Sequence, residues 1–261
     1  MVKQLTICLA LLCGWAAGAD YICGIGRSDS AELPMVSTDK MLYSQWHDCV
    51  LWMPFVAAGP AGTYYDYSGN EFDGSQTNPA SRPTWGNGYY DFDGTNDIVS
   101  RIGIGLTTCS ILTMSAWIKT STNATMRIVS LTDRTLYSQP QCFIRVLATS
   151  QANVFMRGID TENTSKNGAI VVTDNNWHHI VGVCAGSSGT IHLYVDSVDE
   201  GIASYGGAFT LDTFDATSVG GIDNVTEGQQ FNGLIDDVRI YNRALTSNEV
   251  NAIWSDTKDD H

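Results

Sequence analysis

Oxygen-bearing side chains gather in two stretches of the sequence that are far apart. The first stretch runs Asp66-Tyr-Ser-Gly-Asn70 and continues to Asp73, and the second is an alternating run that contains Asp236. Calcium binds about six to eight oxygens from carboxylates, amide oxygens and backbone carbonyls. The side chains predicted to hold a calcium ion are therefore Asp66, Ser68, Asn70, Asp73 and Asp236.

The same residues have a simpler interpretation that needs no metal. Asp and Asn side chains often bond the backbone two residues further along the chain, which stabilises a turn. Asp66 and Asn70 would then form such turns, and Asp236 would accept main-chain N–H groups. The sequence leaves both interpretations open.

The run around Asp236 predicts a strand followed by a short helix. Leu234, Val238 and Ile240 alternate in step with Asp236, so all four are expected on the face of the strand that meets the core. A carboxylate in that position needs a cation, N–H donors or an arginine, because burying an isolated charge is costly. After the strand, Thr246 and Glu249 have the spacing of a capping box, which predicts a helix start.

Several further motifs follow one another in a fixed order along the chain. They are Val50-Leu-Trp-Met-Pro-Phe55, Tyr90-Asp-Phe-Asp-Gly-Thr-Asn-Asp97, Leu112-Thr-Met-Ser-Ala-Trp-Ile118, Trp177-His-His-Ile-Val181 and Leu193-Tyr-Val-Asp196. Together with the terminal run at 231–245, this order resembles the laminin-G-like domains of the concanavalin A-like lectin and glucanase family, over about residues 46–255. The resemblance implies an all-β, two-sheet antiparallel jelly-roll sandwich with a short C-terminal helix. It also implies calcium between the early loop and the last long strand.

Composition and the first residues indicate an exported, acidic protein. The formal charge is −14, which disfavours nucleic acid as a partner. Residues 1–19 read as a signal peptide, with Lys3, an apolar stretch and the cleavage motif Ala17-Gly-Ala19. That stretch is shorter than the roughly 20 residues of a spanning helix, so we expect no membrane span in the mature chain and a secreted, extracellular location. Residues 20–45 are expected to form an arm or linker, and 256–261 a polar tail.

Carbohydrate is the ligand that the family resemblance favours. Sugar sites need flat aromatic faces beside hydrogen-bonding groups. The aromatic side chains expected to contact a glycan or glycoconjugate, because they lie in or beside polar, glycine-rich loops, are Tyr64, Tyr65, Trp85 and Tyr89. The sequons at Asn123, Asn163 and Asn224 are expected in loops, where a glycosylating host would modify them.

Two other functions were weighed against glycan binding. Enzymes of this family carry a Glu-x-Asp-x-x-Glu strand, which places two carboxyls about 5–5.5 Å apart, and this sequence has no such motif. We therefore expect no catalysis. The alternative is a self-assembling structural subunit of a surface, filament or virion, in which residues 20–45 contact a neighbouring copy.

The cysteines fit an exported chain but do not fix a pairing. Five remain after the signal peptide is removed, so at least one thiol is left over whatever disulfides form. Cys184 is expected to be the buried thiol, because it follows an apolar strand.

Overall fold

The computed structural model describes most of the chain from residue 47 onwards. The described residues are 47–56, 59–86, 88–104, 106, 111–133, 141–158, 163–206, 214–222 and 229–261. The predicted signal peptide 1–19, the arm 20–45, Asn224, Cys23 and Cys109 lie outside them. No helix among the described residues is long and apolar enough to cross a membrane.

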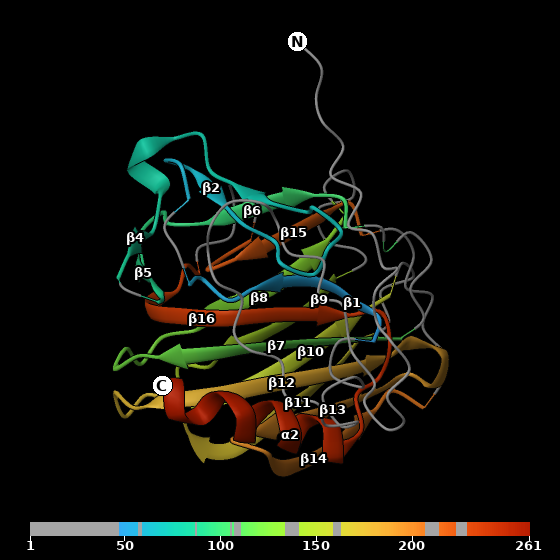
Figure 1. The fold of residues 1–261 in the computed structure, drawn as a ribbon. Coiled ribbons are helices and arrows are strands. Elements are labelled where there is room, and N and C mark those ends of the chain that lie inside the picture. The colour runs from blue at the N-terminus through green and yellow to red at the C-terminus, as the bar shows by residue number, and fades with distance from the viewer. Residues whose placement is uncertain are drawn as a thin grey trace, which may run out of the picture.

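The described residues form two antiparallel sheets that lie face to face, as predicted (Figure 1). In the first sheet the strand order is β14 (Val198–Ser204), β13 (Thr190–Val195), β12 (Trp177–Ala185), β7 (Ile111–Lys119), β16 (Asn232–Tyr241), β5 (Tyr90–Asp93) and β4 (Thr84–Trp85), with β1 (Cys49–Met53) also paired to β16. In the second sheet it is β11 (Asn163–Val171), β10 (Gln151–Arg157), β9 (Gln141–Val146), β8 (Met126–Thr132), β15 (Ala216–Val219), β6 (Val99–Ile102), β3 (Gly74–Ser75) and β2 (Thr63–Tyr64). Short 3₁₀ turns, η1 (Pro79–Ser81), η2 (Gly186–Ser188) and η3 (Lys258–Asp260), and the helix α2 (Ser247–Thr257) complete the described elements.

The main core lies between the two sheets because successive side chains of a strand point to opposite faces. Ile144 of β9 and Val154 of β10 are fully buried there, and Cys184 of β12 is a buried free thiol in the same cluster, as expected. Gly182 of β12 is placed where a Cβ atom would lie only 2.6 Å from Ile144 and 2.8 Å from Val154. The two sheets therefore approach closely at this point, and a glycine is needed for that approach.

Strand β16 does not keep one alternation along its length. Its register against β7 shifts between Asp236 and Arg239, and Asp237 has a φ of 44°. An extra residue at such a bulge reverses which side chains face the core. Ile235 and Val238 thus both enter the core, whereas Leu234 does not. The expectation that Leu234 and Asp236 share the core face with Val238 and Ile240 is wrong for this reason.

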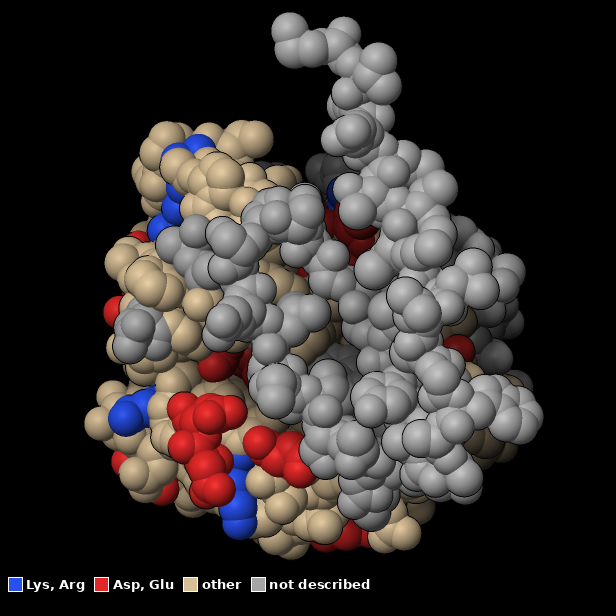
Figure 2. Space-filling model, in the orientation of Figure 1, with Lys and Arg blue, Asp and Glu red and all other residues tan. Residues whose placement is uncertain are grey.

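Helix α2 begins as the sequence predicts and covers the outer face of the first sheet. Thr246 and Glu249 form the capping box in both directions. Val250 and Ile253 pack in a second apolar cluster with Val181 of β12 and other residues of the first sheet. Figure 2 shows acidic side chains gathered on this face beside the helix, whose last turn is followed by Asp259 and Asp260 in η3.

The last residues are packed against the sheet rather than free of it. The ring of His261 stacks on Trp117, with ring centroids 4.5 Å apart, and its Nε2 lies 2.8 Å from Oδ2 of Asp236. The predicted polar tail 256–261 is therefore part of the folded domain, which is a correction to the expected boundary at residue 255. A sequence pattern could not show it, because the contact depends on where α2 directs the chain.

Candidate functional site

The early acidic loop is held together by its own hydrogen bonds. Oδ1 of Asp66 accepts hydrogen bonds from the backbone N–H groups of Trp52 and Ser68, both at 2.9 Å. Oδ2 of Asp66 accepts from Phe72 N at 2.9 Å and from the Ser68 hydroxyl at 2.8 Å. These four donors occupy about as many sites as an ionised carboxylate offers. Asp66 therefore acts here as the centre of a turn.

Asn70 and Asp73 strengthen the same loop. Nδ2 of Asn70 donates to the carbonyl of Val50 at 3.1 Å, and Oδ1 of Asp73 accepts from the backbone N–H of Asp66 at 2.9 Å. The structure thus brings four of the five predicted metal ligands into one loop, on the edge of β1. A calcium ion would have to replace hydrogen bonds that the loop already makes, so the residues do not fit the ion as they are arranged here.

Asp236, the fifth predicted ligand, lies across β1 from that loop. Both N and O of Trp52 are bonded to residues 66 and 67, whereas the other edge of β1 pairs with β16. Asp236 instead bonds the Asp237 N–H at 2.6 Å and His261. Within the described ranges, no group of three or more His, Cys, Asp or Glu side chains could hold a metal ion. The calcium prediction stays a prediction.

Burial separates the four aromatic residues that were predicted to contact sugar. Tyr64 is only 3% exposed and packs edge-on against Tyr90 in the core, so it cannot stack on a ligand, which corrects that expectation. Tyr65 and Tyr89 are half-buried, and Tyr89 packs edge-on against Trp177. Trp85 is 37% exposed, and its Nε1 donates to the carbonyl of Phe55. Trp85 thus offers the most accessible ring of the four.

The two described sequons differ in their surroundings. Asn123 is exposed in the loop between β7 and β8, as expected, and its Oδ1 accepts from the hydroxyls of Ser150 and Thr173. Asn163 is also exposed, but it is the first residue of β11 and not part of a loop. The loop expectation is therefore wrong for Asn163.

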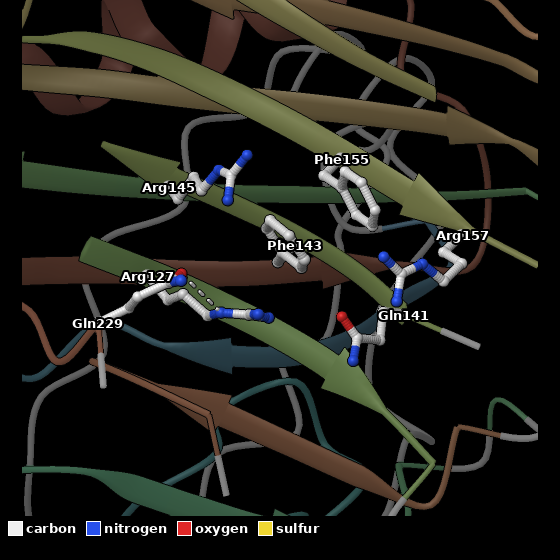
Figure 3. Close-up of a pocket in the computed structure, with 7 residues that line it drawn as sticks. All are labelled: Arg127, Gln141, Phe143, Arg145, Phe155, Arg157 and Gln229. Carbon is white, nitrogen blue, oxygen red and sulfur yellow. Dashed lines mark hydrogen bonds between the residues drawn. The ribbon is translucent and has the colours of Figure 1, made fainter. Parts of the chain in front are cut away.

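A cavity of about 380 Å³ lies on the outer face of the second sheet. Its lining side chains come from β8, β9, β10 and the residues that precede β16, and Figure 3 shows them as sticks. They are Arg127, Gln141, Phe143, Arg145, Phe155, Arg157 and Gln229. None of the seven carries a carboxylate, and three of them are arginines.

Strand register brings these side chains together. Phe143 of β9 is paired with Phe155 of β10, and Gln141 is paired with Arg157. Residues that are directly paired point to the same face of a sheet. Arg127 is paired with Arg145 across β8 and β9, and a register shift just beyond Arg127 marks a bulge in β8. Three neighbouring strands therefore present one continuous patch of aromatic, amide and guanidinium groups.

Aromatic stacking holds the guanidinium groups in place. The rings of Phe143 and Phe155 are stacked, with centroids 4.6 Å apart and planes 12° from parallel. The guanidinium carbon of Arg127 lies 4.0 Å from the Phe143 centroid, and that of Arg157 lies 5.3 Å from the Phe155 centroid. Such cation–π contacts fix an arginine without neutralising its charge.

Neutral amides accept hydrogen bonds from two of these arginines. Nε of Arg127 donates to Oε1 of Gln229 at 3.2 Å, and Nε of Arg145 donates to Oδ1 of Asn153 at 2.8 Å. Asn153 is completely buried, and its Nδ2 donates to the carbonyl of Lys166 and to Oδ1 of Asn167. These two bonds turn the amide so that its oxygen must face Arg145. Burial lowers the pKa of Arg145 from its ordinary value.

The sequence analysis missed all seven lining residues. A signal was nevertheless present, because Gln141, Phe143 and Arg145 alternate with apolar residues, and so do Phe155 and Arg157. An outward face made of aromatic and basic side chains is unusual in a chain with 14 Lys and Arg against 28 Asp and Glu. What the alternation could not supply was the register that joins the strands.

Comparison with known proteins agrees with the fold. Residues 86–251 match the model of the concanavalin A-like lectin/glucanases superfamily. The binding domain of Paraclostridial Mosquitocidal Protein 1 is 16% identical, with a TM-score of 0.64 over 81% of this chain and 53% of that one. The ligand binding domain of botulinum neurotoxin serotype D, solved in complex with N-acetylneuraminic acid, is 14% identical, with a TM-score of 0.62 over 83% and 53%.

A third similar structure is that of an oligomeric protein. The native heptameric SAP-like pentraxin from Limulus polyphemus is 20% identical, with a TM-score of 0.51 over 63% of this chain and 80% of that one. This chain spans about half the length of the toxin domains that it matches. A search of curated proteins finds no match. At these identities the likeness shows a shared fold.

Proposed function

Because the chain belongs to the concanavalin A-like lectin/glucanase superfamily, we propose that it is a binding module that holds a glycan or glycoconjugate in the cavity on β8, β9 and β10. The observation that carries this proposal is the cavity lining itself, in which two stacked phenylalanines are surrounded by arginine and glutamine side chains. Sugar hydroxyls bond well to such donors, and the carbon-bound hydrogens of a sugar ring pack well on aromatic surfaces.

The position of the cavity also suits binding. Its lining side chains are mostly on strands rather than on loops, and sites on regular elements are held more precisely. Phe155 is only half-buried, so part of its ring faces the cavity that it lines. The size is within the range of about 300–1,000 Å³ that is usual for ligand pockets. The complex of a similarly folded neurotoxin domain with N-acetylneuraminic acid supports a saccharide as the ligand class.

The same lining supports binding without catalysis. Retaining and inverting glycosidases both use a pair of carboxyl groups beside the scissile bond. The seven side chains around this cavity include no Asp or Glu. We therefore propose that a bound glycan is held and not hydrolysed. Incubation with a polysaccharide panel, followed by chromatography of the products, should show no cleavage.

A glycan array with two variants tests the site. Wild-type protein is expected to retain a subset of glycans, Phe155→Ala to lose them, and Trp85→Ala to keep them, because Trp85 is on β4 of the other sheet. The two variants are matched, since each removes one partly exposed aromatic ring. Thermal unfolding of both confirms that they are folded. Loss of binding in Trp85→Ala alone would move the site to the β4 edge, and no glycan bound by wild type would refute the proposal.

Calcium binding by the 66–73 loop has its own test. A ligand that binds only the folded state raises the melting temperature. A calcium-holding loop should therefore melt higher in excess calcium than in EDTA, whereas a loop held by hydrogen bonds alone should melt at the same temperature in both. Asp73→Asn in the same assay separates a loop effect from calcium bound elsewhere.

Export and self-association are proposals about residues outside the described ranges. N-terminal sequencing of protein recovered from the culture medium should begin at Asp20 if 1–19 is a signal peptide. Light scattering of protein that lacks 20–45 should show a smaller particle if this segment contacts a neighbouring copy. An unchanged particle size would contradict that contact.

A further inference from the structure

The cavity on the second sheet concentrates positive charge in a strongly acidic protein. The chain has a formal charge of −14, with only 14 Lys and Arg, yet three of these basic residues line one cavity. None of the other lining residues, Gln141, Phe143, Phe155 and Gln229, is charged. The local charge is therefore opposite in sign to that of the whole molecule. An electropositive pocket of this kind attracts anions even though the surrounding protein repels them.

The surroundings of the Arg145 side chain give the most direct indication that a ligand binds in this cavity. That side chain makes one hydrogen bond among the described residues, from Nε to Asn153, and it takes part in none of their ion pairs. A guanidinium has five N–H donors, so the donors on its two terminal nitrogens remain for another group. Burying a cation without a counter-charge is unfavourable, and a bound anion would relieve that cost. The lowered pKa of Arg145, caused by burial, is consistent with this view.

The other two arginines are positioned to share an anionic ligand. Figure 3 shows Arg127, Gln141 and Arg157 on one side of the pair of phenylalanine rings and Arg145 on the other. Arg127 and Arg157 each hold the central carbon of a planar guanidinium group over a phenylalanine ring. The N–H groups lie at the edges of those planes, which is where carboxylates and sulfates are bound, often by two parallel hydrogen bonds.

Resting on the proposed glycan-binding function, we infer that this cavity is specific for acidic saccharides and that Arg145 provides the main counter-charge to their carboxylate or sulfate group. A neutral sugar leaves the guanidinium group of Arg145 without a counter-charge among the described residues and binds weakly. Nucleic acid also carries anionic groups, but its many phosphates would meet the repulsion of the acidic remainder of the chain. A saccharide with one or a few acidic groups places its charge in the cavity alone.

Paired glycans that differ only in the acidic group give the test. Purified full-length protein is applied to an array that holds sialylated, uronic-acid-containing and sulfated oligosaccharides, each beside its neutral parent. Wild type is expected to bind acidic members at least about tenfold tighter than their parents, since charge-assisted bonds are the strong ones. The carboxylated and sulfated pairs show which anion is preferred. Added salt should weaken the preference.

Variants identify Arg145 as the source of the preference. Arg145→Gln removes the charge but keeps an amide that can donate to Asn153, and it should reduce the acidic-to-neutral ratio to about one. Arg145→Lys keeps the charge without the fork and should retain part of the ratio. Lys258→Gln is the matched control, because it removes one positive charge from exposed η3 at the helix α2 end. Circular dichroism and melting temperature verify folding, and if Arg145→Gln is unfolded, Arg145→Lys and the salt series decide.

The possible outcomes separate the two proposals. Equal binding of acidic and neutral partners, or a preference that survives Arg145→Gln, would overturn the inference and leave glycan binding intact. Binding of no glycan at all would overturn the proposed function. Tighter binding of a single-stranded oligonucleotide than of any acidic glycan, measured in the same buffer, would also overturn the inference and assign the cavity to nucleic acid.

Discussion

Two arginines on the outer faces of the two sheets, the buried Arg239 and the half-buried Arg145, have opposite surroundings. On the first sheet, under helix α2, Nη2 of Arg239 lies 2.8 Å from Oδ2 of Asp237, and Trp52 Nε1 donates to the same carboxylate. On the second sheet, Arg145 makes its one hydrogen bond to a described residue with the neutral amide of Asn153. The first arginine has its counter-charge inside the protein and serves the fold. The second keeps its charge available, which is what a binding site requires.

The pKa shifts of Asp237 and Arg145 depend in the same way on whether a counter-charge is present. Burial by itself raises the pKa of Asp237, but the charge of Arg239 more than offsets this and holds that pKa below its ordinary value. For Arg145, burial lowers the pKa and no carboxylate opposes the effect. A charge with its counter-charge in place is thus stabilised where it lies, and a charge without one is destabilised until a ligand arrives.

The largest effect is expected from breaking the pair on the first sheet. Asp237→Asn keeps the shape and tolerates the positive φ of this position, but removes the carboxylate that faces the buried cation of Arg239. Unfolding in urea should show a loss of about 3–5 kcal/mol. The double variant Asp237→Asn/Arg239→Met should recover much of that loss. A single variant as stable as wild type would mean that the pair does not hold the face together.

A pH series tests the second charged contact on the same face. Burial raises the pKa of Asp236 to about 6, although the hydrogen bond with His261 by itself lowers that pKa. The pKa of His261 is also raised: burial lowers it, but the bond to Asp236 outweighs that effect. Both groups thus hold protons more strongly in the folded state, so the stability they contribute is lost as pH rises from about 4 to above 6.5.

The expected loss is on the order of 2 kcal/mol between pH 4 and pH 8, measured by urea unfolding at each pH. His261→Gln serves as the comparison, because it keeps a polar group but removes the titrating partner. The difference between the two pH profiles isolates the pair from other carboxylates. Stability that rises with pH more steeply in wild type than in His261→Gln would contradict the assignment.

A smaller effect is expected at the start of α2, which covers the paired face. Thr246→Ala removes the hydroxyl that accepts from the Glu249 N–H and should cost about 1 kcal/mol in a thermal or urea melt. Thr246→Ser retains that acceptor and should be close to wild type. If both variants melted equally low, the methyl group rather than the cap would be responsible.

The smallest change in stability is expected at Arg145 on the second sheet. Arg145→Gln breaks no ion pair among the described residues, so its unfolding free energy should stay within about 0.5 kcal/mol of wild type. This is the sharpest contrast with Asp237→Asn, because each substitution removes one charge, Asp237 being buried and Arg145 half-buried. A loss of several kcal/mol at Arg145 would show that this arginine is structural after all.

The sequence predicted the layered β architecture through the family resemblance of its ordered motifs, and it predicted the helix start from a local pattern. The capping box at Thr246 and Glu249 needs only a spacing of three residues, and the strand motifs carry their own alternation. The bulge beyond Asp236 was not foreseen, since an inserted residue is visible only against a paired strand. The burial of Tyr64 was missed for a similar reason, because its partner Tyr90 is on the other sheet.

The cavity shows most clearly that a sequence pattern does not reveal which strands are paired. Arg127, Phe143 and Phe155 are separated by more than ten residues from one another, and only the register of β8, β9 and β10 makes them neighbours. The predicted glycan residues were chosen from loops rich in turn formers, whereas the candidate site uses the outer face of a sheet. The alternation of Gln, Phe and Arg in β9 was the available signal.

Gly182, which lies on the opposite sheet, affects the geometry of this cavity. Ile144 and Val154, which press on Gly182, alternate with Phe143, Arg145, Asn153 and Phe155 on the same two strands. A methyl group at 182 would act as a wedge, tilting β9 and β10 outward and changing the angle at which their rings and guanidinium groups meet a guest. The ligand preference of the cavity therefore depends on a residue of the other sheet that the ligand does not contact.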